Sequence, residues 1–93
     1  MAIGAVFVGP GVTQAQYEQV FNQVAPTGQM PAGMLSHVAG PTENGWCVVE
    51  VWESQEAIQR FFENTLNQAL QQAGISTDPS LITTFQVHTQ RQA

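Results

Sequence analysis

An Asn44-Gly45 pair separates two runs of β-forming residues and places a tight turn near the middle of the chain. Asn-Gly favours a two-residue hairpin turn, because both residues adopt positive φ angles at little steric cost. The run before the pair, residues 34–39, and the run after it, residues 45–52, are therefore predicted to be two antiparallel strands. What flanks this hairpin decides the fold.

A helical pattern lies on each side of the hairpin. Thr13 and Gln16 have the spacing of a capping box, and an apolar stripe follows at helical spacing: Tyr17, Val20, Phe21 and Val24. Ser54 is a suitable N-cap for the second helix, and Gly74 is placed to end it. Its apolar stripe consists of Ile58, Phe61, Phe62, Leu66, Ala69, Leu70 and Ala73.

Two further strands complete the pattern. Residues 3–8 form an apolar run that Gly9-Pro10-Gly11 ends, and residues 81–89 are rich in Thr, Phe and Val. The predicted order is therefore β-α-β-β-α-β in a single domain, residues 1–93. This order predicts an α+β, ferredoxin-like fold: a four-stranded antiparallel sheet with both helices on one face.

The charge of the chain limits its partners. The net charge is −5, with only Arg60 and Arg91 as basic residues. Nucleic acid and anionic membranes are poor partners for such a surface, because phosphate neutralisation needs several Lys or Arg side chains. The single Cys47 excludes an intrachain disulfide and cysteine-based metal motifs. The apolar N-terminus lacks a basic region and is too short to span a bilayer, so we expect a cytoplasmic, soluble protein.

The strand at residues 45–52 carries an acid in an apolar setting. Alternation places Glu50 on one face with Trp46, Val48 and Trp52, and places Cys47, Val49 and Val51 on the other. We expect the face with the tryptophans to be the one that the helices leave uncovered. Such a patch predicts a homodimer, in which two sheets pack face to face and close an α+β barrel.

The remaining strands add polar residues to the same prediction. In the last strand, Phe85 and Val87 are expected under the helices, which leaves Thr84, Gln86 and His88 on the uncovered face. The pattern of the second strand does not decide where His37 points. If His37 points away from the helices, it joins Glu50, Gln86 and His88 on one concave surface walled by Trp46 and Trp52.

Several segments resemble a known superfamily over nearly the whole chain. They are Leu35-Ser36-His37-Val38-Ala39-Gly40-Pro41, the run GWCVVEVWES with the helix start after it, and Phe85-Gln86-Val87-His88. These resemble the dimeric α+β barrel superfamily, and more narrowly its antibiotic-biosynthesis-monooxygenase-like branch. The resemblance implies the dimeric barrel fold, whereas activities in the superfamily range from cofactor-free oxygenases to isomerases. The first strand has no Asn, so the Asn-Trp-His set of the haem-degrading members has no clear counterpart.

Two functions remain open at this point. In the first, the protein is a cofactor-independent monooxygenase or isomerase for a small apolar or aromatic molecule, with no metal. His37 or His88 would be the general base and Glu50 would orient it, while Trp46, Trp52 and Gln86 would bind the substrate. In the second, it is a non-catalytic homodimer that binds a ligand or serves as a stress or accessory module. A Glu–His pair could then be purely structural, and the tryptophans could be core.

Overall fold

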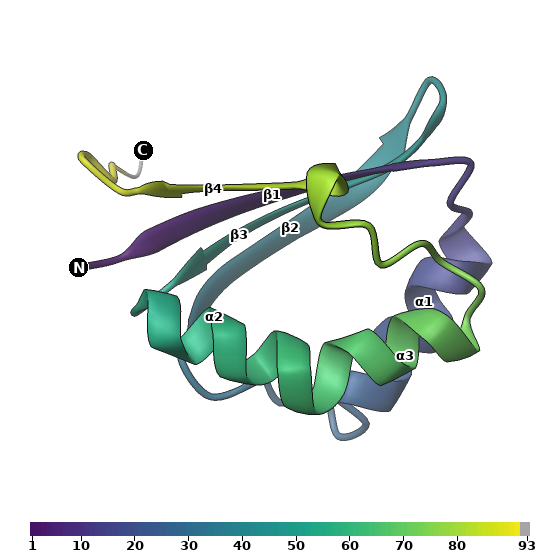
Figure 1. The fold of residues 1–93 in the computed structure, drawn as a ribbon, viewed down its shortest axis with the longest axis horizontal. Coiled ribbons are helices and arrows are strands. Elements are labelled where there is room, and N and C mark those ends of the chain that lie inside the picture. The colour runs from purple at the N-terminus through teal and green to yellow at the C-terminus, as the bar shows by residue number, and fades with distance from the viewer. Residues whose placement is uncertain (92–93) are drawn as a thin grey trace.

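The computed structural model describes residues 1–91, and its strands form one four-stranded antiparallel sheet in the order β2-β3-β1-β4. The strands are β1 (Ile3–Pro10), β2 (Met34–Thr42), β3 (Gly45–Trp52) and β4 (Ile82–Gln86). The helices are α1 (Gln14–Val24), α2 (Gln55–Phe61) and α3 (Asn67–Gln72), with a π-helical turn η1 (Phe62–Leu66) and a 3₁₀ turn η2 (Pro79–Leu81). The helices lie on the same side of the sheet (Figure 1). The predicted ferredoxin-like α+β fold is confirmed.

Local signals start and stop the helices where the sequence predicts. The Thr13 hydroxyl accepts a hydrogen bond from the Gln16 amide N–H at 3.2 Å, and the Thr13 N–H donates to the Gln16 side chain at 3.0 Å. The Ser54 hydroxyl accepts from the Ala57 N–H at 3.1 Å. Gly74 follows the last helix with φ of 75°, a left-handed conformation that favours glycine.

The second helical segment differs from the regular helix that its stripe predicts. It runs from α2 through η1 into α3, so its middle turn is a π turn. A π turn contains one residue more than an α turn and therefore rotates the side chains that follow it. Phe62 and Leu66 in this turn pack against a buried cluster that includes Val20 and Leu70. The core therefore lies between the helices and the sheet.

The face of the sheet that the helices cover is the opposite of the one expected. Trp46 and Trp52 are 7% and 0% exposed, and the Trp52 ring lies 5.1 Å from that of Phe61 in α2. The prediction that the tryptophan face is uncovered is therefore wrong. Both faces of β3 are apolar, so alternation separates them without indicating which one meets the helices. The larger aromatic side chains fill the space between the sheet and the helices.

The uncovered face of the sheet is apolar as well. Four of its side chains are at least two-fifths exposed: Val8 (48%), Val38 (67%), Val49 (41%) and Phe85 (51%). Phe85 was expected under the helices, but Thr84 occupies that side and Phe85 lies across Gly4 on the other. A Cβ at position 4 would meet the tip of the Phe85 ring, so the ring packs against the strand only where position 4 has no side chain. Cys47, which alternation puts on the face first expected under the helices, is a half-buried free thiol on this uncovered face.

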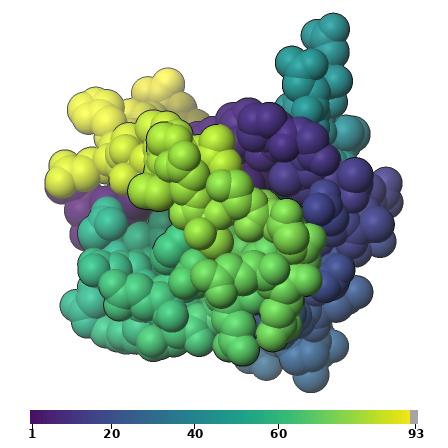
Figure 2. Space-filling model, turned by 45° about the vertical axis from the view of Figure 1, so that its right-hand side comes forward, coloured from purple at the N-terminus to yellow at the C-terminus, as the bar shows by residue number. Residues whose placement is uncertain are grey.

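The strand ends also differ from the sequence boundaries. β2 continues to Thr42, and the tip of the β2–β3 hairpin protrudes from the body of the molecule (Figure 2). The Gly11 N–H donates to the Asn44 carbonyl at 2.8 Å, which ties this hairpin to the end of β1. β4 ends at Gln86, three residues before the predicted end at Thr89.

Candidate functional site

A β-bulge in β2 decides where His37 points. Met34 pairs with Trp52 and His37 pairs with Glu50, but the register shifts between Met34 and Ser36. The extra residue, Leu35, is 57% exposed. Because a bulge puts two residues opposite one, Met34 and His37 share a face although two residues lie between them. His37 therefore joins Glu50, and both face the helices, which corrects the expected concave surface on the uncovered side.

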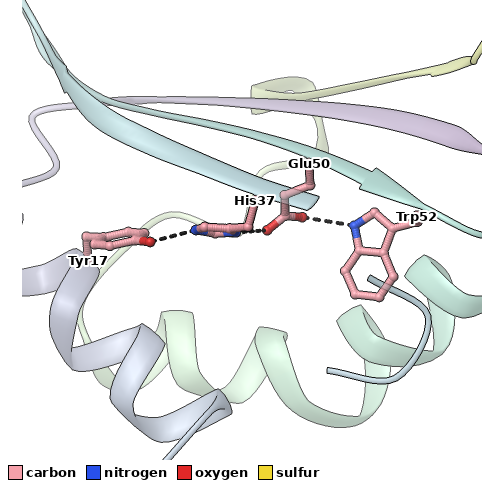
Figure 3. A network of polar contacts seen from close by, with 4 residues as sticks. All are labelled: Tyr17, His37, Glu50 and Trp52. Carbon is pink, nitrogen blue, oxygen red and sulfur yellow. Dashed lines mark hydrogen bonds and ion pairs between the residues drawn. The ribbon is translucent and has the colours of Figure 1, made fainter. Parts of the chain in front are cut away.

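Four side chains form a continuous polar chain between the sheet and the helices (Figure 3). The Tyr17 hydroxyl lies 2.6 Å from His37 Nε2, and His37 Nδ1 lies 2.9 Å from Glu50 Oε2. The Trp52 indole N–H donates to Glu50 Oε1 at 3.0 Å. The side chains of His37 and Glu50 are only 12% and 16% exposed. His37 and Glu50 are thus in contact, in the interior between the sheet and the helices and not on an outer surface.

The carboxylate determines the direction of these hydrogen bonds. An ionised Glu50 only accepts, so His37 Nδ1 must carry the proton that it donates. In the neutral imidazole, Nε2 is then the acceptor, and the Tyr17 hydroxyl donates to it. Both ring nitrogens of His37 are therefore engaged, one with β3 and one with α1.

Tyr17 is a functional candidate that the sequence pattern indicates only as a member of the helical stripe. It is the only tyrosine in the chain, and it reaches the sheet from α1. Burial raises the pKa of the Tyr17 phenol, and the negative charges of Glu50 and Glu18 raise it further. A phenol in an otherwise apolar stripe is the one sequence signal that could have marked it.

A cavity of about 370 Å³ lies beside this polar chain. Its walls come from the sheet and from the helices, and they include Phe7, Phe21, Trp46, Ile58, Phe62 and Leu66. Tyr17, His37 and Glu50 contribute the polar atoms at one part of this wall. The combination of mostly apolar walls with a few converging polar groups is typical of small-molecule sites.

The two tryptophans have different positions with respect to the cavity. Trp46 lines it, as predicted for a pocket wall, and its ring stacks 5.1 Å from that of Tyr17. The Trp46 Nε1 atom is buried without a hydrogen-bond partner among the described residues. Trp52 does not line the cavity; it is fully buried and holds Glu50 through its indole N–H.

Two predicted site residues lie away from the cluster. His88 is exposed and follows the end of β4, and no hydrogen bond joins it to Glu50. Gln86 is the last residue of β4 and is also exposed, outside the cavity lining. The His88 prediction extended the alternation of the last strand beyond Gln86, where the strand ends. Gln86 pairs with Ile3 on the face of Trp52, as alternation predicts, but at the end of the sheet and outside the cavity lining. Within residues 1–91, no three His, Cys, Asp or Glu side chains gather in a way that could hold a metal ion.

The comparisons with known proteins find structural similarity without close sequence similarity. No family model matches the chain, and no curated protein matches it. Among solved structures, a proposed antibiotic biosynthesis monooxygenase from Chloroflexus aurantiacus has a TM-score of 0.66 at 14% identity, covering 99% of this chain and 98% of that one. SnoaB, a cofactor-independent oxygenase from Streptomyces nogalater, has a TM-score of 0.57 at 21% identity, covering 99% and 93%.

A third structure bears on assembly. A dimeric ferredoxin-like protein of unknown function from Thermobifida fusca has a TM-score of 0.59 at 16% identity, covering 91% of this chain and 88% of that one. In the part of the chain that the structure covers, no helix has the length and apolar character needed to cross a membrane.

The structural similarities show that the chain has the fold found in antibiotic biosynthesis monooxygenase-like proteins.

Proposed function

We propose that this protein binds a small, flat, mostly apolar molecule in the cavity and removes a proton from it, with His37 as the general base and without a metal or organic cofactor. The observation that carries the proposal is the His37 ring held between Glu50 and Tyr17 at the wall of that cavity. At about 370 Å³ the cavity falls within the size range of small-molecule sites.

The arrangement suits proton abstraction near neutral pH. An imidazole is a suitable general base, and a carboxylate on its other nitrogen orients the ring and stabilises the cation that forms. The walls keep water away from the anion of the substrate. Reprotonation of that anion at another carbon gives isomerisation. Its reaction with molecular oxygen converts a CH₂ group and O₂ to a carbonyl and water, which is a cofactor-independent oxygenation.

Deuterium exchange tests the removal of the proton, whether the resulting anion is later reprotonated or reacts with oxygen. The probes are 2-tetralone and 2-indanone, flat bicyclic ketones with acidic C–H groups, and the exchange of these protons in heavy water is followed by NMR. We expect the wild type to accelerate exchange and His37→Ala to lose about 10²–10⁴-fold of that acceleration. His88→Ala is the matched control, because it removes the other histidine at a position outside the cavity, and it should exchange like the wild type.

A second candidate function is binding without catalysis. It is favoured by the engagement of both His37 nitrogens, which is also what a purely structural link between α1 and the sheet requires. In that case, the ketones bind but exchange at the same rate with wild type and His37→Ala, and the variant loses stability. Loss of exchange in a stably folded His37→Ala protein excludes this second function.

We also propose that the protein is a homodimer that packs through the uncovered sheet face. This face exposes Val8, Val38, Val49 and Phe85, which together make an apolar surface that monomeric proteins rarely leave in water. The dimeric protein from Thermobifida fusca, which shares the fold, supports the proposal. The residues differ from those first expected, since the tryptophans lie on the other face.

A further inference from the structure

We propose that Tyr17 relays the proton between the bound molecule and the base His37: Tyr17 takes the proton from the molecule, and His37 receives the proton that Tyr17 releases. This inference rests on the proposed function and adds a catalytic residue to it. It follows from the engagement of the His37 ring and from the position of Tyr17 at the cavity wall.

Both ring nitrogens of His37 are already hydrogen-bonded. Nδ1 is 2.9 Å from Glu50 Oε2 and Nε2 is 2.6 Å from the Tyr17 hydroxyl. A neutral imidazole has one proton and one lone pair, and these two contacts use both. A substrate proton therefore has no direct route to His37 unless Tyr17 moves away.

The Tyr17 oxygen, in contrast, can still accept a proton from the cavity. Tyr17 and His37 both line the cavity, and the Tyr17 hydroxyl occupies the Nε2 side of the His37 ring. A phenol that donates its proton to Nε2 still has lone pairs with which to accept. Glu50 also lines the cavity, but its two oxygens already accept from His37 and Trp52. The group that the cavity offers to an acidic proton is thus the phenol oxygen.

The proton transfer balances as a relay. The C–H bond of the ligand breaks as an O–H bond forms at the Tyr17 oxygen. The original Tyr17 O–H bond breaks as an N–H bond forms at His37 Nε2. The electron pair stays on the ligand, which becomes an enolate, and His37 becomes a cation beside Glu50. The net charge of the site and ligand is the same before and after.

A neutral phenol is the state that the site maintains. Burial and the nearby carboxylates raise the pKa of Tyr17, so a free tyrosinate is disfavoured. Because Tyr17 gains one proton as it gives up another, the relay does not require a lasting phenolate. The raised pKa is therefore compatible with the proposed role.

The same wall indicates the chemical class of the ligand. Within residues 1–91 the Trp46 indole N–H has no acceptor, and the Trp46 ring stacks on Tyr17. A buried donor without a partner is costly, and an acceptor oxygen on the ligand relieves that cost once the indole ring shifts to present its N–H to the cavity. An enolisable cyclic ketone supplies both an acidic C–H for Tyr17 and a carbonyl oxygen for Trp46.

The test compares Tyr17→Phe, His37→Ala and the double variant in the 2-tetralone and 2-indanone exchange assay. The dissociation constant of each ketone is measured separately, from the change in tryptophan fluorescence. We expect Tyr17→Phe to retain ketone binding and to lose about 10²-fold or more in exchange at saturating ketone. The double variant should be no slower than either single variant, because residues that act as one unit are not additive.

Three outcomes separate this inference from the proposed function. Exchange by Tyr17→Phe at the wild-type rate or faster overturns the role of Tyr17, while the base role of His37 stands. Wild-type exchange that is no faster than that of His37→Ala overturns the proposed function and the inference with it. Loss in both single variants that multiplies in the double variant shows that they act independently and also overturns the relay.

A second measurement covers the case in which Tyr17→Phe fails to fold. Tyr17 is the only tyrosine, so growth on fluorotyrosine replaces this one phenol by a more acidic phenol of nearly the same shape. In the relay, the exchange rate changes with the acidity of the phenol, while ketone binding does not. An unchanged exchange rate in the fluorinated protein overturns the inference.

Discussion

The substitution Glu50→Gln tests whether Glu50 fixes the direction of the hydrogen bonds that run from Trp52 through His37 to Tyr17. Glu50 accepts two N–H groups, from His37 Nδ1 and from Trp52 Nε1. A glutamine side chain has one accepting oxygen and one donating amide, so it satisfies both neighbours only if His37 changes tautomer. With Trp52 kept as donor to the new oxygen, the new amide N–H donates to Nδ1. Nε2 then carries the proton and donates to the Tyr17 oxygen.

The cost follows from the change in hydrogen-bond type. Two charge-assisted bonds, each contributing about 1.5–3 kcal/mol, become neutral bonds of about 0.5–1.5 kcal/mol each. The side chains involved are at most 16% exposed, so water compensates little. We expect Glu50→Gln to lower the free energy of unfolding by about 2 kcal/mol. For a domain of this size each kcal/mol shifts Tm by roughly 4–8 °C.

Two measurements are needed, at one fixed protein concentration. Urea unfolding gives the change in stability, and NMR of the His37 ring nitrogens gives the tautomer. Glu43→Gln is the matched control, because it removes the same charge at an exposed turn position and should stay within about 0.5 kcal/mol of wild type. The reasoning is refuted if Glu50→Gln is as stable as the control and His37 keeps its proton on Nδ1.

Three further predictions concern the pH dependence, the helix cap and the dimer. The folded-state pKa of Tyr17 is raised above its ordinary value of 10.0, so the phenol of the unfolded chain ionises first as pH rises past that value. The contribution of Tyr17 to the free energy of unfolding then falls with rising pH. The urea midpoint of the wild type should fall in this pH range, and that of Tyr17→Phe should lack this fall. Thr13→Ala removes the cap of the helix that carries Tyr17 and should cost about 1 kcal/mol in thermal unfolding, whereas Ala at the neighbouring exposed Gln14 should cost much less. Val38→Lys should give a folded monomer in sedimentation, while Lys at exposed Gln71 leaves the dimer; a dimeric Val38→Lys protein contradicts the proposed interface.

The fold is readable from the sequence because its signals are local. The Thr13–Gln16 capping box, the Ser54 cap and the glycine after the last helix each depend on neighbouring residues only. Element order then leaves few topologies, since connections are short and right-handed. The π turn at residues 62–66 was missed because its apolar spacing also fits an ordinary helix.

The orientation of the sheet was not readable in the same way. Both faces of β3 are apolar, and alternation gives two sets without assigning either set to the helices. In β2, the bulge at Leu35 changes the phase between Met34 and His37, which no regular alternation can predict. The contact of His37 with Glu50 is one of the two phases that the pattern of this strand leaves open, and the bulge selects it.

The composition of the site depended on contacts between distant elements. Tyr17 belongs to a helix and meets His37 across the core, so sequence spacing gives no sign of the contact. His88 was grouped with Glu50 by continuing the last strand to Thr89, but the strand ends at Gln86. Whether Tyr17, His37 and Glu50 carry out catalysis stays a prediction.

A crystal structure of the protein soaked with 2-tetralone tests the central claim most directly. The account predicts that the ketone lies between the sheet and the helices, with an acidic carbon beside the Tyr17 oxygen and its carbonyl toward Trp46. It is contradicted if the ketone binds only on the uncovered sheet face, or if it fills the cavity with its acidic carbons turned away from Tyr17 and His37.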